Sequence, residues 1–260
     1  MSVERTREAD RPHVAHLRFD VDDLNRLTAD DADELREAIA STPEDVTVLT
    51  LAAPQPADGV RGLTAGLDLD WAQDLSAHEG YDLLQSFYDM IEAVRDLDAV
   101  TVCGCGDYTI GVGFELAAAC EFRVATTDAT LGLPEVDVGL PTVIHGGLLL
   151  RLVGEGVANE LIYTGETISG ERARDLGIVT ATAPPADYDD ELAALVDTLA
   201  EKSPTALQAQ KRVLRRFRSN GLESGMQASI GDAGRVFGSD DQREAMAAFL
   251  EDREPEFDHG

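Results

Sequence analysis

Apolar residues recur along this chain with two different periods, and the alternation between them outlines the secondary structure. A period of two, or a short continuous apolar run, predicts a β-strand, whereas a period near 3.6 predicts a helix with one apolar face. Residues 14–19 are apolar at alternate positions, and 46–53 form a nearly continuous apolar run. The predicted strands are 14–19, 46–53, 100–105, 122–126 and 178–183.

Between these strands the apolar positions follow a helical period. Thr28 is a suitable N-cap for the first long helix. The apolar stripes of the two long helices are Ala32, Leu35, Ala38 and Ile39, and then Leu84, Phe87, Ile91, Val94 and Leu97. A short helix is expected over 114–120, and the chain is mostly helical after Gly146.

Strands that alternate with helices predict an α/β fold in which helices connect the strands. The Pro184–Pro185 pair separates the last predicted strand from a C-terminal stretch with a helical pattern. We therefore expect an α/β core over residues 1–195 and a helical region over 196–260.

Charge adds a second strong signal. The chain carries 50 acidic and 21 basic side chains, for a net charge of −29, and Lys202 and Lys211 are its only lysines. Such a surface repels nucleic acid and anionic membranes, so neither is expected as a partner. Self-repulsion also destabilises a compact chain unless salt screens it, and at ~1 M salt the Debye length is about 3 Å. The composition is therefore typical of a halophile.

The sequence contains no signal for a membrane or for export. No apolar run reaches the roughly 18 residues that a membrane span requires. Residues 1–12 lack the apolar stretch of a secretory signal. We therefore expect a cytoplasmic protein.

Cysteines and histidines do not form a recognisable metal site. Cys103, Cys105 and Cys120 lie inside apolar segments with no further ligand type beside them, so we expect them to pack in the core. His13 and His16 could be read as a metal pair, but near a terminus we interpret them as solvated side chains. No metal is expected.

Common cofactor motifs are absent as well. Gly111 and Gly113 begin a G-x-G pattern, but Leu116 occupies the third glycine position of a dinucleotide fingerprint. The chain also has no G-x-S-x-G elbow and no phosphate loop that ends in Gly-Lys-Ser/Thr.

Two glycine-containing turns are suited to present backbone N–H groups. They lie at 62–70 and 111–117. Glycine allows a tight turn, and the first N–H groups of a helix have no partner within it. If the turns came together they would form an oxyanion hole. Most helices begin at similar residues, so turn chemistry alone does not decide the question.

Glu115 and Glu135 are candidate acid–base residues with an ordinary alternative. Glu115 also suits the N-terminus of a helix, and Glu135 also suits a salt-adapted surface. In a chain with 50 acidic residues, the pair has no meaning until its context is known.

Several segments resemble, in order, those of the enoyl-CoA hydratase/isomerase (crotonase) superfamily. Residues 111–125 resemble the signature segment of that family, and 129–140 resemble the segment that follows it. The twenty-residue interval from Glu115 to Glu135 matches the two catalytic glutamates of the hydratases. Further similarity lies at 24–25, 64–69, 161–177 and 245–257, so the resemblance covers about residues 20–258.

The resemblance implies a fold and a site. The fold is a crotonase-like spiral of repeated ββα units with a C-terminal helical region. The backbone N–H groups of Leu67 and Val112 would hold the thioester oxygen of an acyl-CoA. Glu115 is assigned to water activation and Glu135 to the proton at the α-carbon. The substrate-binding residues would include Ala65, Gly66, Asp68, Gly111, Arg215 and Arg216.

The resemblance also implies an assembly and a place for coenzyme A. The family forms trimers, often paired into hexamers, through its C-terminal helices, so we expect a homotrimer or hexamer. Coenzyme A is a polyanion, and residues 211–218 are the only dense basic run. Arg215, Arg216 and Arg218 are candidates for contacts with its phosphates. Cations that complement a helix C-terminus explain this run equally well.

The chain departs from the family pattern at three places, one of which is Gly106-Asp107, where the family has Asn-Gly. Val112 stands where the family has the middle one of three glycines. A β-branched residue resists positive φ, so we expect Val112 at negative φ, with methyl groups that narrow the pocket. Residues 140–151 differ in spacing from the usual Pro-Gly-x-Gly-Gly-Thr form. His145 lies in this stretch and is interpreted as loop packing rather than as a catalytic residue.

Three functions remain open from the sequence. The leading prediction is hydration of a trans-2-enoyl-CoA to a 3-hydroxyacyl-CoA. A double-bond isomerase, which needs one carboxylate base and no water, is an alternative. A non-catalytic acyl-CoA-binding homologue is a third, because of the departures at Val112 and 140–151. No cofactor is expected in any of these, since coenzyme A is part of the substrate.

Overall fold

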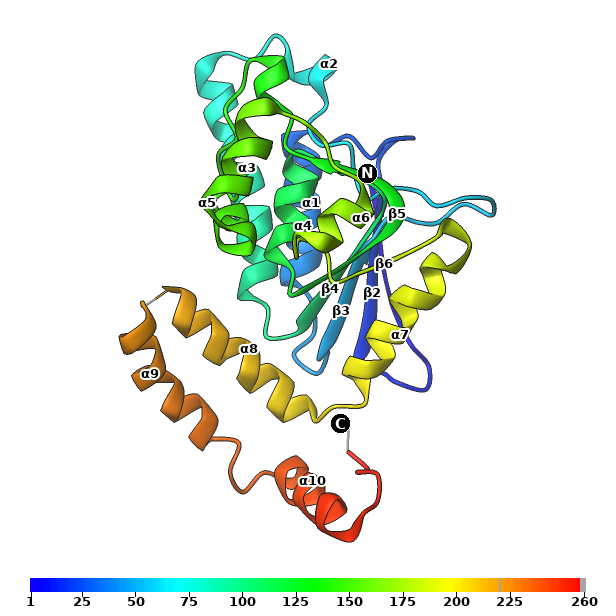
Figure 1. The fold of residues 1–260 in the computed structure, drawn as a ribbon, viewed down its shortest axis with the longest axis vertical. Coiled ribbons are helices and arrows are strands. Elements are labelled where there is room, and N and C mark those ends of the chain that lie inside the picture. Colours follow the sequence, from blue (N-terminus) through cyan, green and yellow to red (C-terminus); the bar gives the residue numbers. More distant parts are fainter. Residues whose placement is uncertain (220, 258–260) are drawn as a thin grey trace.

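A computed structural model describes residues 1–219 and 221–257, and its centre is a six-stranded sheet (Figure 1). The strands lie in the sheet in their sequence order. β1 is antiparallel to β2, and each later pair of neighbours is parallel. The strands are β1 (Ser2–Arg7), β2 (Val14–Asp20), β3 (Val48–Ala52), β4 (Val100–Ile110), β5 (Phe122–Gly132) and β6 (Ala181–Ala183).

The five predicted strands are confirmed as β2 to β6, but β4 and β5 are longer than predicted. β4 and β5 each have 11 residues, because polar residues and glycines such as Gly106 and Asp107 continue a strand after its apolar part has ended. The sequence does not predict β1. This strand lies at the edge of the sheet and carries charged residues, so it has no apolar alternation to detect.

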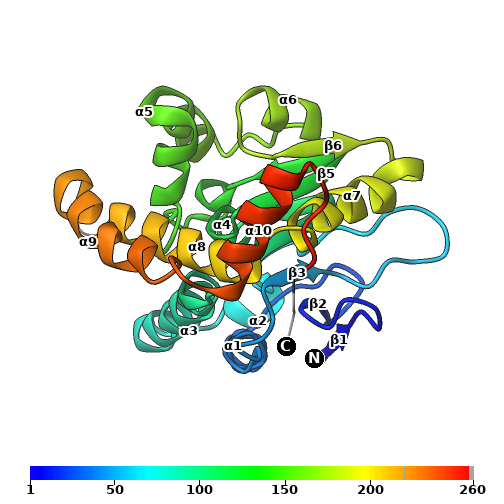
Figure 2. The ribbon, with the colours of Figure 1, turned by 90° about the horizontal axis from the view of Figure 1, so that it is seen from below.

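Helices cover both faces of the sheet (Figure 2). They are α1 (Ala29–Ala40), α2 (Leu69–Ala72), α3 (Ala77–Asp96), α4 (Val112–Ala119), α5 (Gly147–Thr164), α6 (Gly170–Asp175), α7 (Tyr188–Ala200), α8 (Pro204–Ser219), α9 (Leu222–Gly234) and α10 (Asp240–Glu251), with 3-10 turns η1 (Glu135–Val138) and η2 (Pro185–Asp187). α1, α3 and α4 share a core with Leu49 and Cys103 on one face, and α7 packs on Val48 and Val102 of the other. The predicted α/β class with a C-terminal helical region is confirmed. Across the described residues, no helix has the length and apolar character of a membrane span.

The predicted environment is right for the cysteines and wrong for one histidine. All three cysteines are buried in the core. His13 is only 2% exposed, and its Nε2 lies 3.2 Å from the carbonyl oxygen of Ala200. His16 is partly buried, with Nδ1 2.8 Å from the hydroxyl of Thr50 and Nε2 3.0 Å from Glu8 Oε1. His13 is held by α7, and His16 by β3 and by Glu8 just after β1. The position of the two residues near a terminus does not reveal these contacts.

A buried ion pair fastens α8 to the sheet. Lys211 is 2% exposed, and its Nζ lies 2.9 Å from Oε2 of Glu121, just before β5. The same ammonium group donates to the carbonyl oxygen of Ala99, just before β4, at 2.7 Å. α8 is therefore anchored at the amino ends of the parallel strands. The boundary predicted near residue 195 falls inside α7, which lies against the sheet.

Candidate active site

Three loops that follow neighbouring parallel strands meet at the carboxyl end of the sheet, away from the anchor of α8 (Figure 1). The loop after β3 leads to α2, the loop after β4 opens α4, and the loop after β5 opens η1. Ligand sites of open α/β sheets lie at this end. Both turns and both glutamates that the sequence singles out belong to these three loops.

Asn25 holds the first turn in place. This side chain is completely buried, and its Nδ2 donates to the carbonyl oxygens of Phe19 at 3.1 Å and Leu63 at 2.9 Å. Its Oδ1 accepts from the backbone N–H of Val21 at 2.9 Å. These bonds tie the turn to the end of β2. Gly66 completes the turn at a φ of +92°, which residues with a side chain rarely adopt.

Gly111 forms the second turn, between β4 and α4. Its φ of +59° and ψ of −128° lie in a region that glycine tolerates and other residues avoid. Val112 is the first residue of α4 and is not among the non-glycine residues with positive φ, which confirms the expectation of negative φ. As the first helical residue, Val112 has no acceptor for its N–H inside the helix.

The two turns touch each other. A Cβ placed on Gly66 would lie 2.9 Å from the carbonyl oxygen of Ile110 and 3.7 Å from the Cα of Gly111. Within the described residues, neither the N–H of Leu67 nor that of Val112 donates to another backbone group. Two unpaired amides on adjacent turns are the donors that a developing oxyanion requires.

Glu115 lies in the first turn of α4 and is almost completely buried, with 3% exposure. Burial, and then the charge of Glu135, raise the pKa of Glu115 to about 8. The backbone amides of Gly146 and His145 offset part of this rise. Oε1 of Glu115 has no hydrogen-bond partner among the described residues. Glu115 is therefore protonated at neutral pH, whereas the role assigned to it from the sequence needs the ionised form.

Glu135 opens η1 and lies beside the second turn. Its Oε1 is 3.4 Å from the position that a Cβ on Gly111 would occupy. Its Oε2 accepts a hydrogen bond from the hydroxyl of Thr142 at 2.7 Å. Glu115 and Glu135 line the same pocket, and the charge of Glu135 is the second cause of the raised pKa of Glu115. The two glutamates and the two turns therefore converge at one place.

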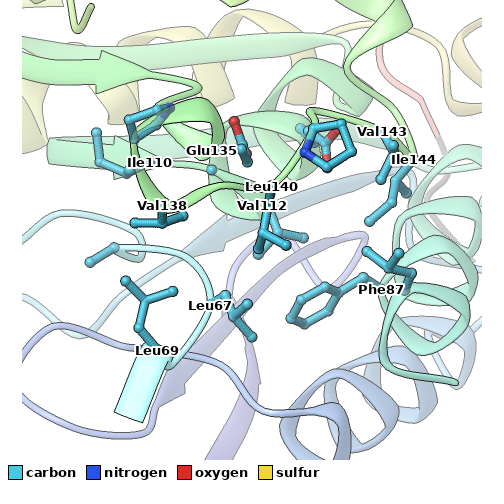
Figure 3. Close-up of a pocket in the computed structure, with 16 residues that line it drawn as sticks. Leu67, Leu69, Phe87, Ile110, Val112, Glu135, Val138, Leu140, Val143 and Ile144 are labelled. Carbon is cyan, nitrogen blue, oxygen red and sulfur yellow. The ribbon is translucent and has the colours of Figure 1, made fainter. Parts of the chain in front are cut away.

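These groups line a pocket of about 160 Å³ with apolar walls (Figure 3). Among the described residues that line it, Glu115 and Glu135 are the only ionisable ones. Much of the wall is formed by Leu67, Leu69, Phe87, Val112, Val138 and Ile144. Apolar walls exclude water from the pocket, and charges and dipoles interact more strongly where water is absent.

The other predicted substrate-binding residues on the two turns differ in whether they line the pocket. Ala65 on the first turn and Gly111 on the second turn both line it. Gly66 allows the two turns to approach each other. The side chain of Asp68 caps α2 instead, accepting from the N–H of Trp71 at 3.1 Å.

Arg215 and Arg216 do not reach the pocket of the same chain. Arg215 pairs with Asp98 at 2.6 Å, just before β4 begins, and Arg216 pairs with Asp232 on α9. The pocket lies at the other end of β4, whose 11 residues extend about 33 Å at roughly 3.3 Å per residue. The basic run on α8 is thus largely paired with carboxylates of its own chain.

The sequence does not reveal two further contacts at the site. The hydroxyl of Thr142 holds Glu135, as described above. His145 packs in the loop, as the sequence suggests, but its Nε2 also lies 2.6 Å from Oε1 of Glu92, 53 positions earlier in the chain. Its ring stacks on Tyr88, with centroids 5.0 Å apart. Contacts between residues so distant in sequence leave no periodic signal.

The arrangement can perform acid–base chemistry beside a carbonyl group. The two amides can stabilise negative charge on a carbonyl oxygen. The carboxyl groups can exchange protons with water and with carbons next to that carbonyl. Within the described ranges, no group of three or more His, Cys, Asp or Glu residues is arranged to hold a metal ion.

Comparison with known proteins gives a consistent result. The family described as enoyl-CoA hydratase/isomerase matches residues 11–260. A crotonyl-CoA hydratase from Syntrophomonas wolfei is 29% identical over 238 residues, or 90% of either chain. A probable enoyl-CoA hydratase from Bacillus subtilis is 34% identical over 200 residues, 76% of this chain and 78% of the relative. The solved enoyl-CoA hydratase of Mycobacterium smegmatis has a TM-score of 0.89 at 28% identity, with 98% of each chain covered, which confirms the expected crotonase-like fold.

Proposed function

Because the chain belongs to the enoyl-CoA hydratase/isomerase family, we propose that it is a hydratase, which adds water to a trans-2-enoyl-CoA to give a 3-hydroxyacyl-CoA. The convergence of Glu115 and Glu135 beside two unpaired backbone amides carries this proposal. The similarity to a crotonyl-CoA hydratase over 90% of the chain supports it. The reaction as proposed uses no cofactor.

The substrate thioester oxygen would accept hydrogen bonds from the N–H groups of Leu67 and Val112. These bonds withdraw charge from the conjugated double bond, so that its β-carbon becomes electrophilic. They also stabilise the enolate-like charge that appears on the oxygen during addition. The apolar acyl chain would lie along the pocket wall that includes Phe87 and Val138.

Hydration needs one proton in total on the pair of glutamates. The ionised carboxyl takes a proton from water as the water oxygen bonds to the β-carbon, while the protonated carboxyl delivers its proton to the α-carbon. At the end the pair again holds one proton, now on the other residue. In the free site burial places this proton on Glu115, so the assignment of Glu115 as base applies once the proton has moved to Glu135.

Two observations favour hydration over the other two functions. An isomerase needs only one carboxyl group to move a proton along the acyl chain, whereas this pocket holds two. A protein that only bound acyl-CoA would have no need to bury Glu115, because burial of an ionisable group disfavours its charged form.

The proposal is tested by incubating the full-length protein with crotonyl-CoA in ~1 M KCl, which screens its net charge. We expect the absorbance of the conjugated thioester to fall as water adds. If absorbance instead rises with a 3-enoyl-CoA and crotonyl-CoA is left unchanged, the protein is an isomerase. No change with either substrate would contradict both enzymatic functions and leave acyl-CoA binding.

We expect kcat/KM for crotonyl-CoA to fall as the pH rises through about 8. The pKa of Glu115 is raised to about 8, and above this pH Glu115 loses the proton that the α-carbon has to receive. The profile should be measured at constant ionic strength, because the protein is highly charged. A rate that stays constant from about pH 7 to about pH 10 would contradict this account of the pair.

We also propose that the C-terminal helices assemble the protein and contact coenzyme A. Phe249 and Leu250 on α10 are 85% and 83% exposed, and Ile230 on α9 is 68% exposed, a surface suited to burial in a homotrimer or hexamer. Arg215 and Arg216 lie far from the pocket of their own chain. Contacts with CoA phosphates would therefore be made with substrate held by a neighbouring subunit.

A further inference from the structure

One short loop, residues 141–146, touches both carboxyl groups of the site. The hydroxyl of Thr142 donates to Oε2 of Glu135 at 2.7 Å. The backbone amides of His145 and Gly146 interact with Glu115 and lower its pKa against the larger effect of burial. A Cβ on Gly146 would lie 3.2 Å from Oε1 of Glu115, so the carboxyl group lies beside this part of the loop.

A polar cluster fastens this loop to α3. His145 is 5% exposed, and its Nε2 lies 2.6 Å from Oε1 of Glu92. Arg95 forms an ion pair with the same oxygen of Glu92. The ring of His145 stacks on Tyr88 at an interplanar angle of 24°. Tyr88, Glu92 and Arg95, on one side of α3, thus surround the side chain of His145.

The tautomer of His145 follows from these contacts. Burial lowers the pKa of His145, so the ring is neutral at neutral pH. A carboxylate can only accept, so the proton of the neutral ring lies on Nε2 and is donated to Glu92. Nδ1 is then an acceptor, and it has no hydrogen-bond partner among the described residues. The side chain of His145 is therefore held by its hydrogen bond to Glu92 and by its stacking on Tyr88, and Nη1 of Arg95 lies 3.3 Å from the same Nε2.

The backbone of the loop is strained between these contacts. Ile144, which lines the pocket, has a φ of +47°, a rare conformation for a β-branched residue. A residue keeps such a conformation only where its surroundings hold it there, and such residues cluster at functional sites. The anchors on either side of Ile144 are Thr142, bonded to Glu135, and His145, bonded to Glu92.

We propose that Glu92, His145 and Thr142 are positioning residues, which hold the 141–146 loop so that it sets the places of both catalytic glutamates. None of the three has to touch the substrate. Glu92 and His145 act on Glu115 through the loop backbone, and Thr142 acts on Glu135 directly. The proposal rests on the proposed hydratase function, because it assigns these residues to the same site.

A leucine at position 145 tests the proposal, since it fills space without the hydrogen bond to Glu92. We expect H145L to lower kcat for crotonyl-CoA by about 10- to 100-fold while KM changes less than about threefold, because a displacement of about 1 Å costs rate rather than binding. H145Q can still donate to Glu92 and should recover most of the loss. H78L is the matched control, since His78 on α3 also lies beside a carboxylate, but its side chain is 87% exposed. H78L should leave kcat unchanged.

The alkaline limb of the pH profile distinguishes positioning from simple loss of folded protein. Glu135 is the ionisable side chain whose charge acts on Glu115, while Glu92 and Arg95 act on the ring of His145. Burial is the largest cause of the raised pKa of Glu115, so a loosened loop that admits water should move the limb to lower pH. We expect a shift of about half a pH unit or more in H145L and none in H78L.

T142V and T142S provide a second test that does not depend on His145. Valine has nearly the shape of threonine without its hydroxyl, so T142V should fold and lower kcat by about tenfold or more, while T142S should stay near the wild type. The proposal is overturned if folded H145L keeps the wild-type kcat and an unchanged alkaline limb of the pH profile. Equal rates for T142V and T142S would also overturn it.

The proposed function and the positioning role can fail separately. If the wild-type protein does not hydrate crotonyl-CoA, the function fails, but the carboxyl of Glu115 can still be titrated by carbon NMR in the full-length protein. A lower pKa of Glu115 in H145L than in H78L would still support the positioning role. Identical titration curves in these two variants would refute it.

Discussion

Glu135→Gln is expected to lower kcat for hydration of crotonyl-CoA by about 10³-fold, which is within the range of rate effects of general acid–base catalysis. Glutamine keeps the size of the side chain and can still accept from Thr142, but it can neither take nor supply a proton. Glu115→Gln should lose a similar factor. Because the two carboxyls exchange one proton, the double variant should be only slightly slower than either single variant.

Asp137→Asn is the matched control for Glu135→Gln. Asp137 lies two residues later on η1 and is exposed, so its loss of charge should leave kcat within about twofold of the wild type. The decay of the conjugated thioester absorbance gives kcat for all variants, and thermal melts report whether they are folded. A folded Glu135→Gln variant with the wild-type rate would contradict the proposed acid–base pair.

Gly111→Ala has the second largest expected effect, a fall in kcat of about 10²- to 10³-fold, which is the effect of losing one oxyanion donor. The φ of +59° at Gly111 is strained for alanine, and its Cβ would lie 3.4 Å from Oε1 of Glu135. Relief of this strain requires the turn to rotate, and Val112 follows directly, so its N–H would leave the place where it can meet the thioester oxygen.

Gly80→Ala is the corresponding glycine control. Gly80 is inside α3, and a Cβ there meets nothing within 4 Å. We expect this variant to keep wild-type kcat and to gain about 1 kcal/mol of unfolding free energy, because alanine favours a helix over glycine. If Gly111→Ala behaves in the same way as Gly80→Ala, the second turn does not contribute a donor.

Elements with an apolar period could be located from the sequence, and the others could not. β3 and most of the helix stripes of α1 and α3 are predicted because they are buried on regular positions. Leu84 departs from its predicted stripe, because it is 41% exposed and lines the pocket while Leu83 is buried. The ends of β4 and β5 are missed because their polar residues are paired only by the neighbouring strand. β1 is missed for the same reason, since its partner β2 satisfies its backbone while its side chains face water.

The site was predicted through the family resemblance rather than from chemistry. In a chain with 50 acidic residues, nothing local distinguishes Glu115 and Glu135 from the rest. What distinguishes them is burial against a second carboxyl group, and that depends on how the loops after β4 and β5 meet. The bond between His145 and Glu92 spans 53 positions, and no local pattern contains it.

The local charge pattern also could not predict which groups the basic run of α8 contacts. A cluster of arginines suggests a site for an anion, but here Arg215 and Arg216 meet Asp98 and Asp232 of the same chain. Each aspartate is separated in the sequence from its arginine, and only the fold brings the two together. The proposed contact of this run with coenzyme A therefore depends on the proposed assembly of several chains.

The buried ammonium group of Lys211 limits how far the protein can be shortened. A chain that ended near residue 195 would keep all the described residues that line the pocket, since these end at Ile144. It would nevertheless leave the carboxylate of Glu121, which is 13% exposed, without its counter-ion. Removing one partner of a buried pair costs about 3–5 kcal/mol, a large part of the stability of an ordinary domain. A minimal catalytic fragment therefore has to extend past residue 211.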